Sequence, residues 1–211
     1  MRARRGQAGT GPATPVPPEG MRLTGGARAV WRELRDTALA IAAGLAAALL
    51  LRHFAVQTYH VEGPSMQPTL WTGERLLVDK LVLRLHPPRA GQIVVLQPPL
   101  GRCAAVLPGS PDFVKRVIAT GGQTVSITNG VVLVDGGPQP EPYLVALDGD
   151  PTDQLAPLTV PPGEVWVMGD HRNDSVDSRC FGPVPLSAIH GVAMFVWWPP
   201  SEVRGLRPAS Q

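Results

Sequence analysis

The sequence is poor in lysine. Arginine supplies all but two of the 19 lysine and arginine side chains, and the two lysines are Lys80 and Lys115. Arginine cannot lose its proton in a protein, whereas a buried lysine can. A lysine kept in such a chain is therefore a candidate for a role that needs a neutral amine, with retention by chance as the alternative.

Metal-binding and phosphate-binding motifs are also absent. Cys103 and Cys180 lie outside any C-x-x-C motif, which argues against a zinc site or a thioredoxin-like centre. The histidines are scattered without an H-E-x-x-H pair, and no glycine-rich phosphate loop is present. We therefore predict no cofactor. In an oxidising compartment the two cysteines are able to form a disulfide, but the interpretation that we favour is two separate small apolar residues.

Long helices are not expected over most of the chain. The 211 residues include 23 glycines and 24 prolines, which favour turns and short strands in one globular domain with extensions. Asn129-Gly130 predicts a hairpin turn, and we predict loops at 98–111 and 136–157. Short apolar runs predict strands at 55–61, 75–84, 92–97, 114–119, 124–128, 131–134, 165–168 and 191–198. The expected fold class is mostly β.

One long uncharged run lies near the N-terminus. Residues 37–51 carry no charge and follow seven arginines within residues 1–36. We predict a basic tail over 1–36, disordered up to residue 26, a helix that starts near Ala27, and one transmembrane anchor helix over 37–56. The positive-inside rule places the tail in the cytoplasm and everything after residue 56 outside.

Two alternatives to this anchor remain. A cleaved signal peptide is opposed by the long leader and by the lack of a small-x-small site directly after the run. A buried helix of a soluble protein is the other alternative.

Ser65 is a candidate nucleophile. It lies between Pro64 and Pro68, directly after the strand predicted at 55–61. The two prolines fix the backbone and remove two amide donors, which favours a rigid, exposed turn. The segment is not the G-x-S-x-G elbow of hydrolases, and taken alone it is more typical of a simple turn serine.

Lys115 is a candidate general base. Strand alternation places Phe113, Lys115 and Val117 on one face, which favours burial of the amine. Burial lowers the pKa of a lysine, and a neutral amine beside a serine hydroxyl can take its proton. An exposed or salt-bridged lysine is the alternative.

A polar segment follows the strand predicted at 165–168. Residues 169–179 contain five charged side chains and two serines. Such a density of polar groups at a strand end indicates a hydrogen-bonded network, with a solvated loop as the alternative.

These three segments, in this order behind an apolar anchor, resemble the motifs of bacterial type I signal peptidases, which are serine proteases with a Ser-Lys dyad. The resemblance rests on residues 65–70, 115–118 and 169–179, with a further strand motif at 89–95, and it extends over most of 61–196. It implies a membrane-bound serine endopeptidase with an antiparallel β-sheet catalytic domain. Such an enzyme removes signal peptides from exported preproteins through an acyl-enzyme.

The resemblance also implies roles for individual residues. Ser65 would be the nucleophile, its backbone N–H an oxyanion donor, Lys115 the general base, and Met66 part of the substrate pocket. The supporting residues would be Ser175, which orients the Lys115 amine, Asp177 and Arg179, which pair and hold the loop, and Asp170, a structural acid. The implied partners are secreted preproteins with small-x-small cleavage sites and membrane lipid, without nucleic acid.

Three positions depart from the family pattern. Gly63 stands where some relatives have a serine that serves as a second oxyanion donor, so that donor is unidentified here. Gln92 stands where an acid is usual, and Ala119 where glycine is frequent. None of these positions belongs to the dyad.

We expect the extracytoplasmic protease domain to cover 57–203, with 122–157 as a small inserted hairpin and loop, and with 204–211 as a C-terminal tail. Apolar surface that includes Trp71, Trp197 or Trp198 would contact the membrane. We nevertheless expect at least one of Trp197 and Trp198 to pack in the core.

Three other functions remain open. A self-cleaving repressor with a Ser-Lys dyad would be soluble and bind DNA, which the anchor opposes. An inactive membrane-anchored homologue that binds exported proteins is opposed by the presence of Ser65, Lys115 and Ser175. A Ser-His-Asp hydrolase would use His171 and Asp170.

Overall fold

The computed structural model describes residues 24–100, 103–106, 109, 111–144 and 153–208, without the side chains at 24, 25, 27, 28 and 50–54. The chain divides into two compact units, Met1–Ala48 and Leu49–Gln211. Part of the predicted basic tail, residues 1–23, lies outside the described residues.

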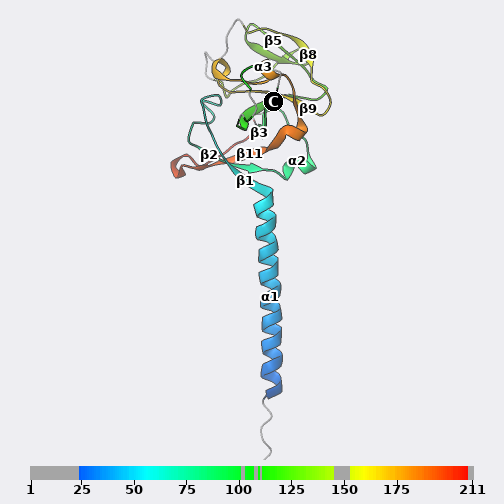
Figure 1. Cartoon of the computed structure of the whole chain (residues 1–211), viewed down its shortest axis with the longest axis vertical. Helices are drawn as coiled ribbons and strands as arrows, with labels where there is room; N and C mark the ends of the chain where they lie inside the picture. The colour runs from blue at the N-terminus through cyan, green and yellow to red at the C-terminus, as the bar shows by residue number, and fades with distance from the viewer. Residues whose placement is uncertain (1–23, 101–102, 107–108, 110, 145–152, 209–211) are drawn as a thin grey trace, which may run out of the picture. The chain divides into compact units, whose positions relative to one another are not determined.

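The N-terminal part of the structure is one long helix, α1 (Thr24–Ala55), as Figure 1 shows. A helix starting near residue 27 was predicted and is confirmed. Several apolar side chains on it are solvent-exposed, among them Leu39, Ile41 and Leu45. No helix in the described part of the chain is both long and apolar enough to span a bilayer. The side chains at 50–54, which belong to the predicted anchor at 37–56, lie outside the described set, and the anchor stays a prediction.

The second unit is built on antiparallel sheets, so the predicted mostly β fold is confirmed. The larger sheet has eight strands in the order β1-β2-β11-β3-β4-β9-β10, with β12 paired to β11. Its strands are β1 (Val56–His60), β2 (Arg75–Asp79), β3 (Ile93–Leu96), β4 (Phe113–Thr120), β9 (Glu164–Met168), β10 (Val184–Pro185), β11 (Ile189–Trp198) and β12 (Arg204–Gly205).

A smaller sheet follows β4 and has the order β7-β6-β5-β8. Its strands are β5 (Thr124–Thr128), β6 (Val131–Val134), β7 (Gly137–Pro138) and β8 (Leu155–Thr159). Asn129 and Gly130 connect β5 to β6 with φ angles of 51° and 78°, as the predicted hairpin turn requires. Figure 1 shows β5 and β8 at the opposite end of this unit from β1, β2 and β11.

Three predicted boundaries are wrong. The C-terminal tail predicted at 204–211 begins with β12, which pairs with β11 and so belongs to the larger sheet. The loop predicted at 136–157 contains β7 and the start of β8. The local sequence of β8 is a poor strand former, but Leu155 and Leu158 pair with β5. The strand predicted at 75–84 ends at Asp79. The Asp79 carboxylate accepts hydrogen bonds from the backbone N–H groups of Leu81 and Val82, and the short helix α2 (Val82–Leu85) follows.

The central strands β3 and β4 are covered on both faces. All four residues of β3 are buried, and in β4 the five consecutive residues 115–119 are buried. Val117 belongs to one apolar cluster with Val94 and Val167, whereas Ile118 belongs to another with Trp166. A strand buried on both faces holds its side chains in fixed positions, and β4 carries Lys115 and Arg116.

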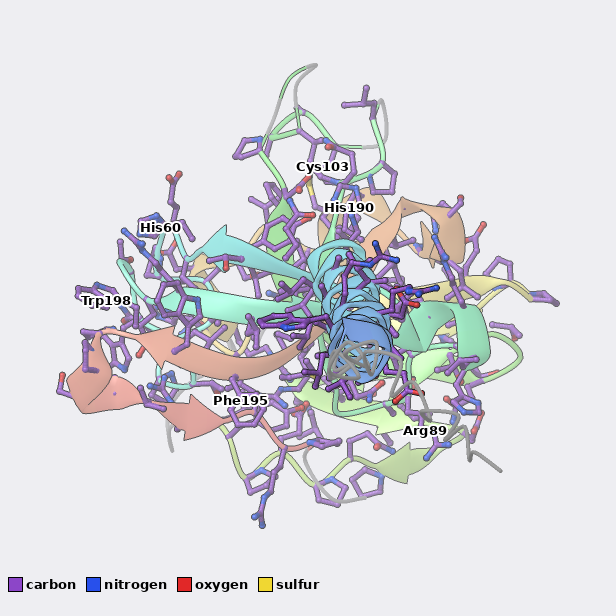
Figure 2. The ribbon with its side chains drawn as sticks, turned by 90° about the horizontal axis from the view of Figure 1, so that it is seen from below. His60, Arg89, Cys103, His190, Phe195 and Trp198 are labelled. Atoms are coloured by element: carbon purple, nitrogen blue, oxygen red, sulfur yellow. A yellow bond between two sulfur atoms is a disulfide. The ribbon has the colours of Figure 1, made fainter. Side chains whose placement is uncertain are left out.

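A disulfide joins Cys103 and Cys180, whose Cα atoms are 5.4 Å apart (Figure 2). The favoured expectation of two separate cysteines is therefore wrong. The two residues are 77 positions apart in the sequence, so only the folded chain brings them together. The bond attaches the segment before β4 to the short helix α3 (Ser178–Phe181).

Aromatic side chains at the end of β11 are exposed. Trp197 is 37% and Trp198 is 44% exposed, so the expectation that one of them packs in the core is wrong. A register shift between Val196 and Trp198 interrupts the pairing of β11 with β2, which breaks the inward and outward alternation. Figure 2 shows Phe195 and Trp198 along this end of the strand.

Candidate active site

Ser65 and Lys115 meet in the folded chain. The Lys115 Nζ donates a hydrogen bond to the Ser65 Oγ over 2.8 Å and another to the Val114 carbonyl over 3.0 Å. Ser65 lies in the turn that follows β1, and Lys115 lies in β4. A serine hydroxyl and an amine at this distance are able to exchange a proton directly.

Residues 63–74, between β1 and β2, carry Ser65 and are called the nucleophile turn below. Backbone hydrogen bonds and buried side chains hold this turn. The Gln67 N–H donates to the Pro64 carbonyl over 2.9 Å, and the Leu70 N–H donates to the Met66 carbonyl over 2.8 Å. Met66 and Leu70 are almost completely buried in one apolar cluster. Gly63 opens the turn with a φ of 80°, which a residue with a Cβ rarely adopts. These contacts anchor the backbone on both sides of Ser65.

Lys115 has the surroundings of a neutral amine. It is 4% exposed, and burial lowers the pKa of its amine from 10.5 to about 8, against the opposing effect of the Asp177 and Asp170 carboxylates. The Nζ atom also lies 5.0 Å from the centre of the Phe113 ring. At a pH of about 8 or above, half or more of Lys115 is therefore unprotonated.

This pKa predicts the pH dependence of any reaction that uses Lys115 as a base. The kcat/KM should fall about tenfold per pH unit below about pH 8, because only the neutral amine accepts a proton. Between about pH 8 and 10.5 the unfolded chain binds a proton that the folded chain does not, so stability should rise with pH in this window.

A pH profile with a stability control checks this prediction. Enzyme held at pH 6 and returned to pH 9 should recover its activity, which separates protonation of Lys115 from unfolding. A flat profile between pH 5 and pH 9 would contradict a role of Lys115 as the base.

Arg116, the neighbour of Lys115, forms a buried ion pair with Asp170. Its Nε and Nη2 atoms donate to the two Asp170 oxygens over 2.8 and 2.6 Å, and both side chains are almost fully buried. The Nη1 atom donates to the Gly91 carbonyl over 2.7 Å. A bidentate pair of this kind fixes geometry well, and it attaches the end of β9 to β4 beside the dyad.

Asp177 and Arg179 form the pair that the resemblance implied. Asp177 is fully buried, and its carboxylate accepts hydrogen bonds from the Arg179 side chain over 2.9 Å and from the Gly169 backbone N–H over 3.0 Å. Arg179 also donates to the Arg172 carbonyl and to Asp153. The segment that follows β9 thus contains a hydrogen-bonded network built on buried charged side chains, while Asn173 and Asp174 are exposed.

Ser175 lies next to the nucleophile turn, but its hydroxyl does not reach Lys115. The Ser175 Oγ is buried and has no hydrogen-bond partner among the described residues. A Cβ placed on Gly169 would lie 2.2 Å from this oxygen and 2.4 Å from the Ser65 carbonyl oxygen. Gly169 therefore permits the close approach of three segments, and the sequence analysis did not single it out for that role.

Sequence analysis also missed two residues of the connection between β7 and β8. Glu141 pairs with the buried Arg172, and it accepts a hydrogen bond over 2.9 Å from the Tyr143 hydroxyl. The Tyr143 ring lies 3.9 Å from the Arg116 guanidinium, and burial together with Glu141 raises the pKa of its hydroxyl. The density of charge in 169–179 indicated that Arg172 belongs to a network. The sequence pattern around 141–143 did not indicate that Glu141 and Tyr143 contact that network.

The Ser-His-Asp alternative does not match the geometry. The Asp170 carboxylate receives the Arg116 guanidinium. The backbone N–H of His171 donates to the Ser65 carbonyl over 3.1 Å, while the Ser65 hydroxyl receives the Lys115 amine.

A cavity of about 460 Å³ opens beside the dyad. Ser65 and Lys115 lie in its wall together with apolar residues from the segment after β1 and from β4, namely Val61, Met66, Phe113 and Val114. Met66 thus lies where the resemblance expects a pocket residue.

A serine hydroxyl in contact with a buried lysine, at the edge of an open cavity, is the arrangement of a serine hydrolase that uses an amine as its base. Comparison with known proteins agrees with this class. The family described as "Signal peptidase, peptidase S26" matches residues 34–198, and the chain belongs to this family of serine endopeptidases.

Individual relatives cover most of the chain. It is 39% identical to a probable signal peptidase I-1 of Synechocystis, over 82% of this chain and 86% of that protein. It is 37% identical to signal peptidase I T of Bacillus subtilis, over 78% and 86%. It is 33% identical to signal peptidase I of Mycobacterium tuberculosis, over 83% and 77%. A crystal structure of a signal peptidase I from Enterococcus faecalis aligns with a TM-score of 0.42 at 27% identity, over 51% of this chain and 97% of that chain.

Proposed function

We propose that this protein removes N-terminal signal peptides from exported preproteins, with Ser65 as the nucleophile and Lys115 as the general base. The observation that carries the proposal is the 2.8 Å hydrogen bond between the Lys115 amine and the Ser65 hydroxyl, made by a lysine whose pKa burial lowers to about 8. Such an amine is neutral often enough to activate the hydroxyl.

The reaction proceeds in two steps. The Ser65 Oγ bonds to the scissile carbonyl carbon while its proton passes to the Lys115 Nζ. The peptide C–N bond then breaks, and Lys115 returns the proton to the leaving amine. Water attacks the resulting ester with Lys115 again as the base, and it releases the signal peptide and restores Ser65.

Supporting residues hold this geometry. The Ser65 backbone N–H would donate to the oxyanion, and Gly63 offers no side-chain donor. Asp177, with its hydrogen bonds to Gly169 and Arg179, would keep the segment after β9 against the nucleophile turn. Asp170 would do the same through Arg116.

Ser175 would contribute when substrate is bound. Its hydroxyl is buried beside the turn without a partner among the residues that the structure describes. There it would orient the Lys115 amine, the role that the resemblance implied.

The substrate would bind as an extended strand in the cavity next to the dyad. Apolar walls formed by Val61, Met66 and Val114 suit small side chains at the first and third positions before the cut. Preproteins with small-x-small sites are therefore the proposed substrates.

We also place the reaction at the cytoplasmic membrane. The uncharged run at 37–51 and the arginines before it support an anchor over 37–56 with the N-terminus in the cytoplasm. Exposed aromatic side chains on the second unit, Trp71, Phe195, Trp197 and Trp198, offer a surface for lipid. The catalytic domain over 57–203 would then lie outside the cytoplasm.

Cleavage of a preprotein with an Ala-x-Ala site by the detergent-purified full chain tests the proposal. The wild type should cut directly after the site, and Ser65→Ala should lower the rate by about 10⁴-fold or more, because it removes the nucleophile. Thermal unfolding of both proteins controls for folding. A wild type that binds several such preproteins without cutting them would favour the inactive, binding homologue.

A further inference from the structure

The C-terminal strand reaches the turn that carries Ser65. β12 (Arg204–Gly205) lies beyond the residues matched by the family, which end at 198. It pairs with β11, with Arg204 opposite Val196, and the Leu206 N–H donates to the Met194 carbonyl over 2.7 Å. This pairing directs the Arg204 side chain at the far end of the nucleophile turn.

Glu74 closes that turn. Its backbone carbonyl accepts from the Val61 N–H over 2.9 Å, and its carboxylate accepts from the Trp71 N–H over 3.0 Å. Glu74 is 3% exposed. A carboxylate buried this deeply is strongly destabilising without a charged partner, and Arg204 supplies one through hydrogen bonds of 2.7 and 2.9 Å to its two oxygens.

Arg204 holds a second point of the same turn. Its Nη2 atom also donates to the Thr69 carbonyl over 2.7 Å. The Thr69 hydroxyl in turn lies 3.4 Å from the Arg116 guanidinium, which is paired with Asp170 and follows Lys115 in β4. Thr69 is therefore held between the arginine beside the general base and the arginine of the C-terminal strand.

We propose that Arg204 is a positioning residue, which fixes the nucleophile turn against β4 and so sets the distance between the Ser65 hydroxyl and the Lys115 amine. The inference rests on the proposed function, in which these two groups carry out the reaction. A lysine in place of Arg204 can reach Glu74 or Thr69, but one ammonium cannot form the bidentate pair and the carbonyl bond together. Misplacement by about 1 Å is enough to cost a factor of about 10² in rate.

The test uses two variants of the full chain, a double variant at Arg204 and Glu74 and the single variant Arg204→Lys. The double variant is needed because Arg204→Met alone would leave the Glu74 carboxylate buried and unpaired. Arg204→Met combined with Glu74→Gln removes the pair without a stranded charge and keeps an oxygen for the Trp71 N–H. We expect its kcat to fall by about 10- to 100-fold at a temperature well below its unfolding midpoint, with KM changed less than about threefold. Arg204→Lys should fall between this variant and the wild type.

Glu202→Gln is the matched control. Glu202 is 57% exposed in its side chain and lies 3.8 Å from Arg204, outside the nucleophile turn, so this variant should cleave at the wild-type rate. The inference is overturned if both Arg204 variants have the wild-type kcat, or if their loss of kcat disappears on cooling. In either case an inactive Ser65→Ala variant would still support the proposed function. If Ser65→Ala itself still cuts, the proposed function fails and the inference fails with it.

Discussion

Replacing Lys115 by methionine or arginine should lower preprotein cleavage by about 10³-fold. General-base catalysis contributes roughly 10² to 10⁴ in rate, and neither replacement offers a neutral amine at the Ser65 hydroxyl. Methionine keeps most of the buried volume, and arginine keeps the charge but cannot release its proton. The rate of product formation from a purified preprotein measures the effect, and thermal unfolding shows whether each variant folds.

Lys80→Arg is the matched control for these variants. Lys80 is the other lysine of the chain, is exposed, and donates to the Gln57 side chain over 3.1 Å. This exchange should leave the cleavage rate within about twofold of the wild type. Equal cleavage by Lys115→Met and Lys80→Arg would assign Lys115 a structural role only.

Gly169→Ala should lower cleavage by about 100-fold, although Gly169 takes no part in the reaction itself. The new Cβ would lie 2.2 Å from the Ser175 Oγ and 2.4 Å from the Ser65 carbonyl oxygen. The Ser175 side chain is able to rotate, but the Ser65 carbonyl belongs to the backbone of the nucleophile turn. Relief of the clash therefore moves Ser65, and a shift of about 1 Å is sufficient for this loss of rate.

The same substitution at Gly137 provides the comparison. A Cβ on Gly137 would meet its nearest neighbour, the Val134 carbonyl oxygen, at 3.7 Å, an ordinary contact distance. Gly137→Ala should cleave at the wild-type rate. We also expect Gly169→Ala to lower the free energy of unfolding by about 1–3 kcal/mol. Cleavage by Gly169→Ala at the wild-type rate would contradict the close packing of Gly169 against the Ser65 carbonyl.

Much of the sheet was predictable from local sequence. β5 and β6 were predicted with their observed bounds, and β3, β4, β9 and β11 with errors of one or two residues at their ends. Apolar alternation and the Asn129-Gly130 turn are properties of a few neighbouring residues. β8 was missed because its stability comes from pairing with β5, which the local pattern does not contain.

The Ser65–Lys115 dyad, too, was only partly predictable from local sequence. Alternation along β4 favoured burial of Lys115, and burial favoured a lowered pKa, as the structure has it. Alternation did not predict that Arg116, on the opposite face, is buried as well. The 2.8 Å contact with Ser65 joins residues 50 positions apart. The pairing of Ser65 with Lys115 was predicted from the family resemblance, because local sequence patterns do not show which distant segments meet.

Contacts between distant segments of the chain were the part that local sequence did not reveal. The disulfide of Cys103 with Cys180, the pairing of Glu141 with Arg172 and the contact of Arg204 with Glu74 each join residues more than 30 positions apart. Strand periodicity and turn chemistry depend on the nearest few residues and are therefore legible in the sequence. The partner of a buried charge or a thiol depends on which strands pair, and that is a property of the whole fold.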